Sequence, residues 1–179
     1  VKSGEDVLEL LNSLLDMTAI STGKVKLHCQ KIPLAPLVQN RLTFFGIAAK
    51  AKDIEISTSL KSDVEAYVDG KRFSQVIDNL VSNALKFSPR GGHILVELCH
   101  SDGMSKLVVK DSGKGIPKGE AQYLFSDFSR LSTKPTGGEI STGLGLSICK
   151  SIVDAHHGEV YVDQGYQDGA AFVVLVPYN

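Results

Sequence analysis

Three short blocks of polar and glycine residues, far apart along the chain, restrict what this sequence can fold into. The first block runs from Asn79 to Phe87, the second from Asp111 to Ile116, and the third from Thr142 to Ser147. Together they supply two amides, a lysine, a carboxylate and two pairs of glycines, which are the components of an ATP–magnesium site. The sequence contains no Gly-Lys-Ser or Gly-Lys-Thr, so such a site would lack a P-loop. A fold that gives these residues a common role must bring the three blocks together.

Composition and charge narrow the class of protein. Of the 179 residues, 42% are hydrophobic and 22% charged, so we expect one domain with a real core and room for a short appendage. The formal net charge of −1 gives no reason to expect nucleic-acid binding, which usually shows as a basic excess. Three widely spaced cysteines, Cys29, Cys99 and Cys149, argue against disulfides and structural zinc and favour a reducing cytoplasm. The start at Val1 leads us to expect a piece of a longer protein.

The pattern of apolar residues predicts an α+β fold. A wide apolar face at helical spacing predicts a helix over residues 5–20. Further helices are predicted over 34–52, 69–85 and 143–156, and strands at 25–32, 54–58, 66–68, 94–99, 106–110, 160–162 and 171–176. Helices followed by hairpins indicate a two-layer sandwich with one mainly antiparallel sheet and helices on one face.

Several details of these elements can be predicted as well. In the helix over 34–52, the residues expected to face the core are Leu37, Val38, Leu42, Phe45 and Ala48. Asp69 is expected to cap the next helix, and Asp102-Gly103 to form a hairpin turn. The segment 117–142 has little sustained period, and a loop of that length in a compact domain is often a lid. A boundary near 30–36, marked by two prolines, divides the chain into 1–30 and 31–179.

Asp111 is the candidate residue for reading a base. A carboxylate only accepts hydrogen bonds, so it suits the exocyclic amino group of adenine and disfavours guanine, which presents an acceptor there. Gly113 and Gly115 would let the backbone approach the base closely. The alternative is an ordinary strand-to-turn junction, because Asp-Ser-Gly is common turn chemistry.

Gly143 and Gly145 are the candidates for binding phosphate. They lie where a loop becomes a helix, and free N–H groups with a partial charge of about +0.5 at a helix start favour an anion. A dinucleotide fingerprint would need a third glycine and a preceding strand, and both are lacking. The alternative is a flexible hinge.

Asn79, Asn83 and Lys86 follow one another at i, i+4 and i+7 and so share one face of a helix. The amide oxygen of Asn83 can ligate Mg²⁺ that phosphates already hold, and Lys86 can neutralise phosphate charge. The alternative is a solvated polar stripe opposite the core face.

The order and spacing of these blocks resemble the catalytic, ATP-binding part of sensor histidine kinases, within the wider gyrase, Hsp90, histidine kinase and MutL superfamily. Residues 75–87 resemble that family's N box, 111–116 its first glycine box, 125–130 its phenylalanine box and 143–147 its second glycine box. The resemblance implies a Bergerat-type ATP-binding fold with a mixed, mainly antiparallel sheet. His157 stands where the family often has glycine.

The resemblance also implies a role for each matching residue. Asp111 would read the adenine amino group, Phe87 would stack on the base, and Arg130 would reach the γ-phosphate from the lid. The residues that the resemblance assigns to ATP are Asn79, Asn83, Lys86, Phe87, Asp111, Gly113, Gly115, Ile116, Arg130, Thr142, Gly143, Leu144, Gly145 and Leu146, with Asn83 and Asn79 as ligands of Mg²⁺.

The implied activity is transfer of the ATP γ-phosphoryl group to a histidine outside this sequence. Residues 11–24 resemble the end of the second helix of the family's dimerisation domain, whose first helix carries the acceptor histidine. No histidine here is followed by an acidic residue in the family's pattern, so the acceptor is expected to be absent. The ATP-hydrolysing relatives carry a glutamate base where Asn79 stands. An amide cannot take a proton from water, so slow hydrolysis is expected.

The resemblance implies partners too. They are the phosphoacceptor helical domain of the same protein, a response-regulator receiver domain, and a second subunit in a full-length homodimer. The domain itself would be cytoplasmic, with or without a membrane anchor elsewhere in the parent protein. Two alternatives stay open: a nucleotide-binding regulatory module without transfer activity, and a serine-directed kinase of the same superfamily.

Overall fold

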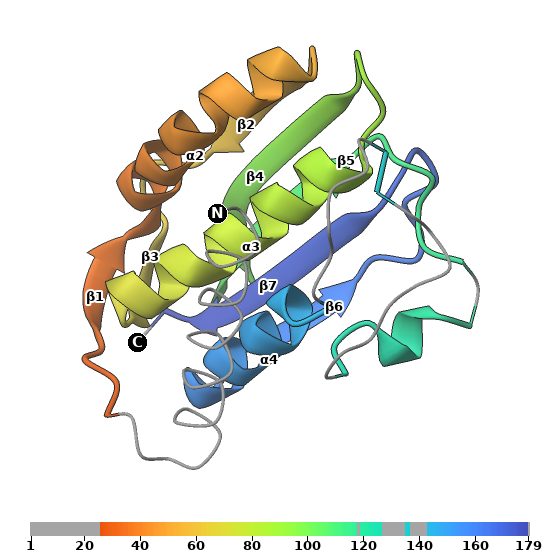
Figure 1. The fold of residues 1–179 in the computed structure, drawn as a ribbon. Helices are drawn as coiled ribbons and strands as arrows, with labels where there is room; N and C mark the ends of the chain where they lie inside the picture. Colours follow the sequence, from red (N-terminus) through yellow and green to blue (C-terminus); the bar gives the residue numbers. More distant parts are fainter. Residues whose placement is uncertain (1–25, 118, 127–134, 137–142, 179) are drawn as a thin grey trace, which may run out of the picture.

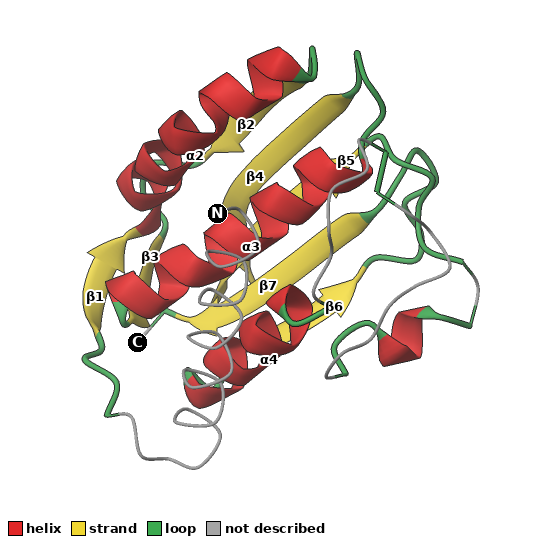
Figure 2. Cartoon of the chain, in the orientation of Figure 1, coloured by secondary structure: helices red, strands yellow, loops and turns green. Residues whose placement is uncertain are grey.

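A computed structural model of the chain describes residues 26–117, 119–126, 135–136 and 143–178. Three helices, α2 (Leu34–Ala51), α3 (Gly70–Phe87) and α4 (Gly145–Ala155), lie on one face of a five-stranded sheet (Figures 1 and 2). This two-layer α+β sandwich confirms the predicted fold class. The helix predicted over residues 5–20 lies outside the described residues. No helix in the described part of the chain is both long and apolar enough to cross a membrane.

The main sheet is mixed and mainly antiparallel, as predicted. Its strands are β2 (Glu55–Leu60), β4 (His93–Ser101), β5 (Met104–Asp111), β7 (Ala171–Pro177) and β6 (Glu159–Val162), in the spatial order β2-β4-β5-β7-β6. Only β2 and β4 run parallel; every other neighbouring pair is antiparallel. A second, two-stranded sheet joins β1 (Gln30–Pro33) to β3 (Glu65–Val68). The strand predicted over 25–32 is therefore shorter than expected and begins only at Gln30.

Helix α3 forms as its sequence predicts. The Asp69 side chain accepts hydrogen bonds from the N–H groups of Lys71 and Arg72, both at 3.1 Å, and so caps the helix start. The apolar stripe predicted to face inward is fully or almost fully buried at Phe73, Val76, Ile77, Leu80, Val81 and Leu85. With that stripe against the sheet, the polar residues between its members lie along the flanks of the helix.

The hairpin that ends at Asp111 also forms where expected. Strands β4 and β5 pair antiparallel, with Ser101 opposite Met104 at the turn. The two turn residues, Asp102 and Gly103, have φ values of 49° and 78°. Two positive φ values in a row are the requirement of a type I′ turn, which Asp-Gly satisfies at low cost.

One prediction for α2 was wrong. Val38 and Leu42 are buried as expected, but Ala48 is exposed and Ala49 is buried in its place. The helix is apolar on most of its circumference, with only two charged residues, so periodicity alone could not select the inward face. Its outer face exposes Phe44 (65%) and Ile47 (85%).

His156 joins the end of α4 to the start of α3. The ring is buried, its Nδ1 donates to the Ile152 carbonyl at 2.7 Å, and its Nε2 accepts from the Asp69 N–H at 2.9 Å. This pair of partners fixes the neutral tautomer with the proton on Nδ1. Burial lowers the pKa of His156, against the opposing effects of the Ile152 carbonyl and the Asp69 carboxylate and with a further lowering from His157.

We expect the free energy of unfolding to fall as the pH drops below 6.5, the ordinary pKa of histidine. Because the pKa of His156 is lower in the folded chain, the unfolded chain takes up the proton first. The stabilisation is complete above 6.5 and is lost as the pH falls through the folded value. Urea unfolding measured between about pH 7.5 and 5.5 tests this slope. Replacing His156 with Gln should reduce the slope, whereas His157→Gln should retain most of it, because His157 makes the smallest of the contributions to the pKa of His156. Equal slopes in both variants would contradict the assignment.

Candidate functional site

The buried carboxylate of the candidate site is Asp111, the last residue of β5, with 3% of its surface exposed. Its Oδ1 atom accepts two backbone hydrogen bonds, from the N–H of Gly113 at 2.8 Å and of Ala170 at 3.1 Å. The backbone of Asp111 is tied as well, because its N–H donates to the Ala170 carbonyl at 2.9 Å. The loop after β5 and the residue before β7 therefore orient this side chain together.

The other carboxylate oxygen, Oδ2, accepts no hydrogen bond within the described part of the chain. Burial raises the pKa of Asp111 above its usual value, and the two N–H groups on Oδ1 partly offset that rise. A poorly solvated carboxylate oxygen gains strongly from a donor. Asp111 thus presents one fixed oxygen to the chain and one to a ligand that carries an N–H or O–H group.

Two glycines allow the loops around Asp111 to touch. A Cβ added to Gly169 would lie only 1.9 Å from the backbone oxygen of Asp111, a distance that real side chains never adopt. A Cβ on Gly115, which has a φ of +70°, would lie 3.0 Å from the Gly169 oxygen. The end of β5 and the turn before β7 can lie this close only because both positions lack a side chain.

Helix α3 connects this carboxylate to the third block. At its C-terminal end, a Cβ on Gly113 would be 2.8 Å from the carbonyl oxygen of Phe87, so the loop after β5 lies against the helix end. In the middle of α3, Asn79 Nδ2 donates to the Gly145 carbonyl at 3.1 Å, at the start of α4. The distance along the helix from Asn79 to Phe87 is about 12 Å. The structure thus brings all three blocks together along one side of α3.

The start of α4 has the form that the sequence predicts for the phosphate-binding loop. Gly143 has a φ of +73°, and the helix begins at Gly145, where an added Cβ would lie 3.7 Å from the side chain of Asn79. The thiol of Cys149 is buried below this helix start and donates to the Val76 carbonyl at 3.8 Å, and burial raises its pKa to about 12. Cys149 is therefore a neutral packing residue and not a nucleophile.

The C-terminal end of α3 is also linked to the segment before α4. Thr136 donates through its N–H to the Lys86 carbonyl at 3.0 Å and through its hydroxyl to the Ser88 carbonyl at 2.6 Å. Lys52, just after α2, donates to the carbonyls of Leu85 and Lys86 at 2.7 and 3.1 Å. The C-terminal end of α3 therefore accepts hydrogen bonds from a residue just after α2 and from the segment that contains the predicted lid.

The other predicted residues divide into three groups. Asn83, Lys86 and Phe87 are half-buried on α3, where ligand atoms can reach them. Leu144 is buried, so only its backbone can serve a ligand, whereas Ile116 and Leu146 are partly buried against the core. Arg130 and Thr142 lie outside the described residues.

The described residues contain no cluster of three or more His, Cys, Asp or Glu side chains that could hold a metal ion. A cation at this site would therefore depend on neutral amide oxygens and on oxygens of the ligand. Asn79, with its nitrogen committed to Gly145, and Asn83, on the same side of α3, fit that requirement for Mg²⁺.

Sequence reasoning missed several residues whose contacts hold the segments of the site together. Gly169 and Ala170 fell between the two predicted strands 160–162 and 171–176, and Thr136 fell in a segment without sustained period. Ser112 was missed as well: its Oγ accepts the His93 N–H at 2.8 Å and ties the loop after β5 to the start of β4. No spacing rule marks these residues, because their contacts join segments far apart in the sequence.

Comparison with known proteins gives a consistent result. The profile of the family described as "Histidine kinase-, DNA gyrase B-, and HSP90-like ATPase" matches residues 68–179. The circadian input-output histidine kinase CikA of Synechococcus elongatus is 32% identical over 178 residues, covering 98% of this chain and 24% of that protein. The sensor histidine kinase TmoS of Ectopseudomonas mendocina is 34% identical over 174 residues, covering 97% and 18%.

Solved structures share the fold. Full-length ShkA in complex with AMPPNP superposes with a TM-score of 0.84 at 25% identity, over 98% of this chain and 36% of that one. The catalytic domain of the histidine kinase ThkA superposes with a TM-score of 0.75 at 27% identity, over 84% of this chain and 96% of that one. The chain therefore spans about a quarter or less of the two curated relatives, but nearly the whole of an isolated catalytic domain.

Proposed function

We propose a reaction for this chain from its family: it belongs to the histidine kinase-, DNA gyrase B- and HSP90-like ATPases, and within them it is an ATP-binding domain of the sensor histidine kinase type. The proposed reaction transfers the γ-phosphoryl group of ATP to a histidine that lies outside these residues. The bond between the γ-phosphorus and the β,γ-bridging oxygen breaks, a bond to an imidazole nitrogen forms, and ADP leaves.

The observation that carries the proposal is the arrangement of Asp111. Its Oδ1 is saturated by two backbone N–H groups, so Oδ2 is left to accept a hydrogen bond from the adenine amino group. Guanine would place an acceptor there, and two acceptors repel. From this point the proposed nucleotide follows α3, with the base near Phe87 and the phosphates near Asn79 and Gly145.

The phosphate end of the proposed site combines backbone and side-chain donors. The N–H groups around Gly143, Leu144 and Gly145 at the start of α4 would cradle phosphate oxygens, with Lys86 and Arg130 supplying positive charge. Asn79 and Asn83 would hold Mg²⁺ through their amide oxygens. When bound, the ion neutralises phosphate charge and orients the triphosphate.

The site favours transfer over hydrolysis. An asparagine at position 79 cannot act as a general base toward water, so the chain itself offers no activation of a water molecule there. Phosphoryl transfer to an imidazole depends mainly on positioning and charge neutralisation, which the groups along α3 and α4 can supply. The proposed acceptor is a histidine on a helical domain of the same protein, and a receiver domain would take the phosphoryl group from it.

The parent protein would be a cytoplasmic or membrane-anchored homodimer in which this domain faces the cytoplasm. The chain spans only 24% and 18% of the two curated relatives. Those relatives are much longer sensor kinases, which leaves room for the acceptor, the sensor and further domains.

We expect the chain alone to bind MgATP but to incorporate no label from γ-labelled ATP. Mixed with a separately produced acceptor domain, it should label that domain, and the label should be lost in acid, as phosphohistidine is acid-labile. Label that survives acid would favour a serine-directed kinase. Nucleotide binding without any transfer would favour a regulatory module. Stable label in the chain alone would overturn the proposal.

Removal of Mg²⁺ should weaken ATP binding far more than binding of adenosine. The cation acts only on the phosphates, whereas Asp111 acts on the base. Titration of both ligands with and without chelator measures the difference. An equal effect on the two ligands would contradict the placement of Mg²⁺ at the phosphate end.

A further inference from the structure

The strand β2 is an open edge of the main sheet. It pairs with β4 on one side and has no strand on its other side within the described part of the chain (Figure 1). The N–H of Glu55 and that of Lys61 donate to the carbonyls of Gly92 and Leu98 on the β4 side. Because successive residues of a strand direct their amides to opposite sides, those of Ile56, Thr58 and Leu60 point to the open edge.

The middle of this edge lacks the features that usually protect one. Natural edge strands carry a lysine, a proline or a bulge that discourages pairing with another chain. Between its ends, β2 reads Ile-Ser-Thr-Ser, without charge or proline, and it pairs with β4 in unbroken register. The strand offers up to three residues with free amides to an incoming strand.

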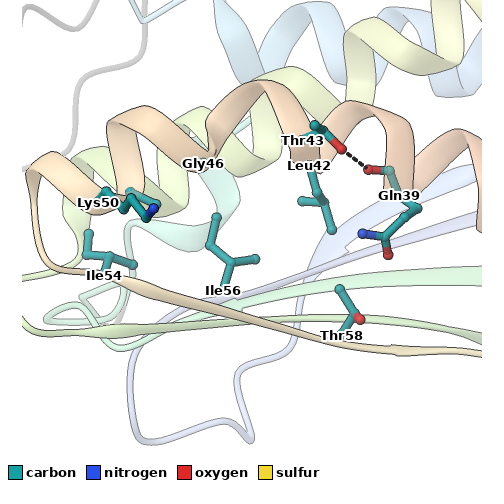
Figure 3. Close-up of a pocket in the computed structure, with 9 residues that line it drawn as sticks. Gln39, Leu42, Thr43, Gly46, Lys50, Ile54, Ile56 and Thr58 are labelled. Carbon is teal, nitrogen blue, oxygen red and sulfur yellow. Dashed lines mark hydrogen bonds between the residues drawn. The ribbon is translucent and has the colours of Figure 1, made fainter.

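A groove runs along the same edge, between β2 and α2. Its volume is about 330 Å³, and its lining includes Leu42, Thr43 and Gly46 of α2 and Ile56 and Thr58 of β2 (Figure 3). A Cβ on Gly46 would meet no atom within 4 Å. Because Ile56 and Thr58 line this groove, their side chains face the helix layer. A strand added at the edge would extend both the sheet and the floor of the groove.

The sequence of the edge is complementary to itself. Residues 55–61 read Glu-Ile-Ser-Thr-Ser-Leu-Lys. Antiparallel pairing of two copies with Thr58 opposite Thr58 places Ile56 opposite Leu60 on the helix side. On the other side it places Ser57 opposite Ser59 and Glu55 opposite Lys61. Every pair is thus apolar with apolar, hydroxyl with hydroxyl, or acid with base, which are the favourable cross-strand pairs.

We propose that two copies of this chain associate through antiparallel pairing of β2 about a twofold axis at Thr58. The outward amides of Ile56, Thr58 and Leu60 then meet the same residues of the partner copy and form the hydrogen-bonded pairs of the ladder. The sheet becomes continuous across the axis, as an isologous contact requires.

Other registers pair less well. A shift by one residue would set helix-side residues against residues of the opposite face. Pairing centred on Ser59 places Glu55 opposite Asp63, two like charges. Pairing centred on Ser57 places Ile56 opposite Thr58 and leaves Lys61 opposite Asp53, which lies outside the strand with a φ of 57°.

The neighbouring helix fits the same contact. A twofold axis perpendicular to the sheet keeps α2 of both copies on one side, next to the junction. Helix α2, which borders the junction, carries two exposed apolar side chains: 65% of the surface of Phe44 and 85% of that of Ile47 is accessible to solvent. In a longer protein that holds two copies together by other domains, the local concentration would raise the occupancy of such a contact.

The contact is separate from the nucleotide site, so their tests are independent. Sedimentation of the chain over a range of concentrations should show a monomer–dimer equilibrium. Thr58→Lys, which places two ammonium groups at the axis, should abolish the dimer, and the matched variant Thr58→Val should retain it. At concentrations below the dissociation constant, where all three are monomeric, ATP binding and the unfolding transition should be the same in both variants and in the wild type. A monomer at all concentrations, or a dimer unaffected by Thr58→Lys, would overturn the proposal.

A charge exchange tests the register. Glu55→Lys and Lys61→Glu should each raise the dissociation constant of the dimer by about tenfold, because symmetry turns two attractive pairs into two repulsive ones. The double variant, in which the two charges are exchanged, should recover the wild-type constant. Failure of the double variant to recover would reject the pairing of Glu55 with Lys61 and thus the proposed register.

Disulfide formation between introduced cysteines provides a second test of the register, in a chain with Cys29 and Cys99 changed to Ser. A mixture of Ser57→Cys and Ser59→Cys chains should form a disulfide on oxidation, because the two positions face each other across the axis. Either variant alone should not. A disulfide from Ser57→Cys alone or from Ser59→Cys alone would assign one of the shifted registers and reject the one proposed.

Discussion

Asp111→Asn should weaken ATP binding by about a hundredfold and leave the fold intact. The two N–H groups of Gly113 and Ala170 both point at Oδ1, so the oxygen of the new amide must take that position. The amide nitrogen then replaces Oδ2 and directs its own N–H groups at the adenine amino group. The oxygen that accepted a hydrogen bond is thus replaced by a nitrogen that donates one. Two donors then face each other at a residue with only 3% of its surface exposed.

The same substitution should reduce discrimination against GTP. The oxygen that guanine presents in place of the amino group can accept from the new amide, so GTP should lose less affinity than ATP, or gain some. Calorimetric titration of both nucleotides into wild type and variant measures the four constants. Thermal unfolding without nucleotide serves as the control, because the variant keeps both backbone hydrogen bonds. Unchanged preference for ATP over GTP in the variant would reject Asp111 as the base-reading residue.

Most of the fold could be predicted because local signals agreed with one another. Helix α3 has a cap at Asp69 and an apolar stripe at the correct period, and both were confirmed; the helix continues to Phe87, two residues past its predicted range. The hairpin β4–β5 followed in the same way from alternation and from Asp102-Gly103. Where a segment carries only one signal, prediction failed: α2 is apolar on most of its surface, and its inward face was misplaced at Ala48.

The candidate site could be predicted only in part. The residues on α3 and the glycines before α4 belong to short patterns with a recognisable chemistry. The contacts that orient them are long-range: Ala170 binds Asp111 across 59 positions, and Thr136 binds Lys86 across 50. Such pairs leave no periodic trace in one sequence. The structure explains why the family often has glycine at position 157, because His157 has a φ of 56° just after α4, in the left-handed region that favours glycine.

Replacing Gly169 with alanine should damage both stability and ATP binding. The new methyl group would lie 1.9 Å from the backbone oxygen of Asp111 and 3.0 Å from its Oδ1, so the end of β5 and the turn before β7 must separate. The cost is about 3 kcal/mol in the free energy of unfolding, at the upper end for an overpacked site. The same separation pulls the Ala170 N–H from Oδ1 and releases the carboxylate from its fixed orientation.

Gly46→Ala in α2 is the matched control. A methyl group there meets no atom within 4 Å and replaces a glycine inside a helix, so it should raise the free energy of unfolding by about 0.5–1 kcal/mol. It should leave ATP binding unchanged. Urea unfolding and nucleotide titration of both variants separate two explanations. Loss of stability with wild-type affinity in Gly169→Ala would mean that the turn before β7 supports the sheet but does not orient Asp111. Loss of affinity beyond the fraction unfolded would mean that the orientation of a single carboxylate, fixed by a backbone contact across the sheet, determines how well the site holds its nucleotide.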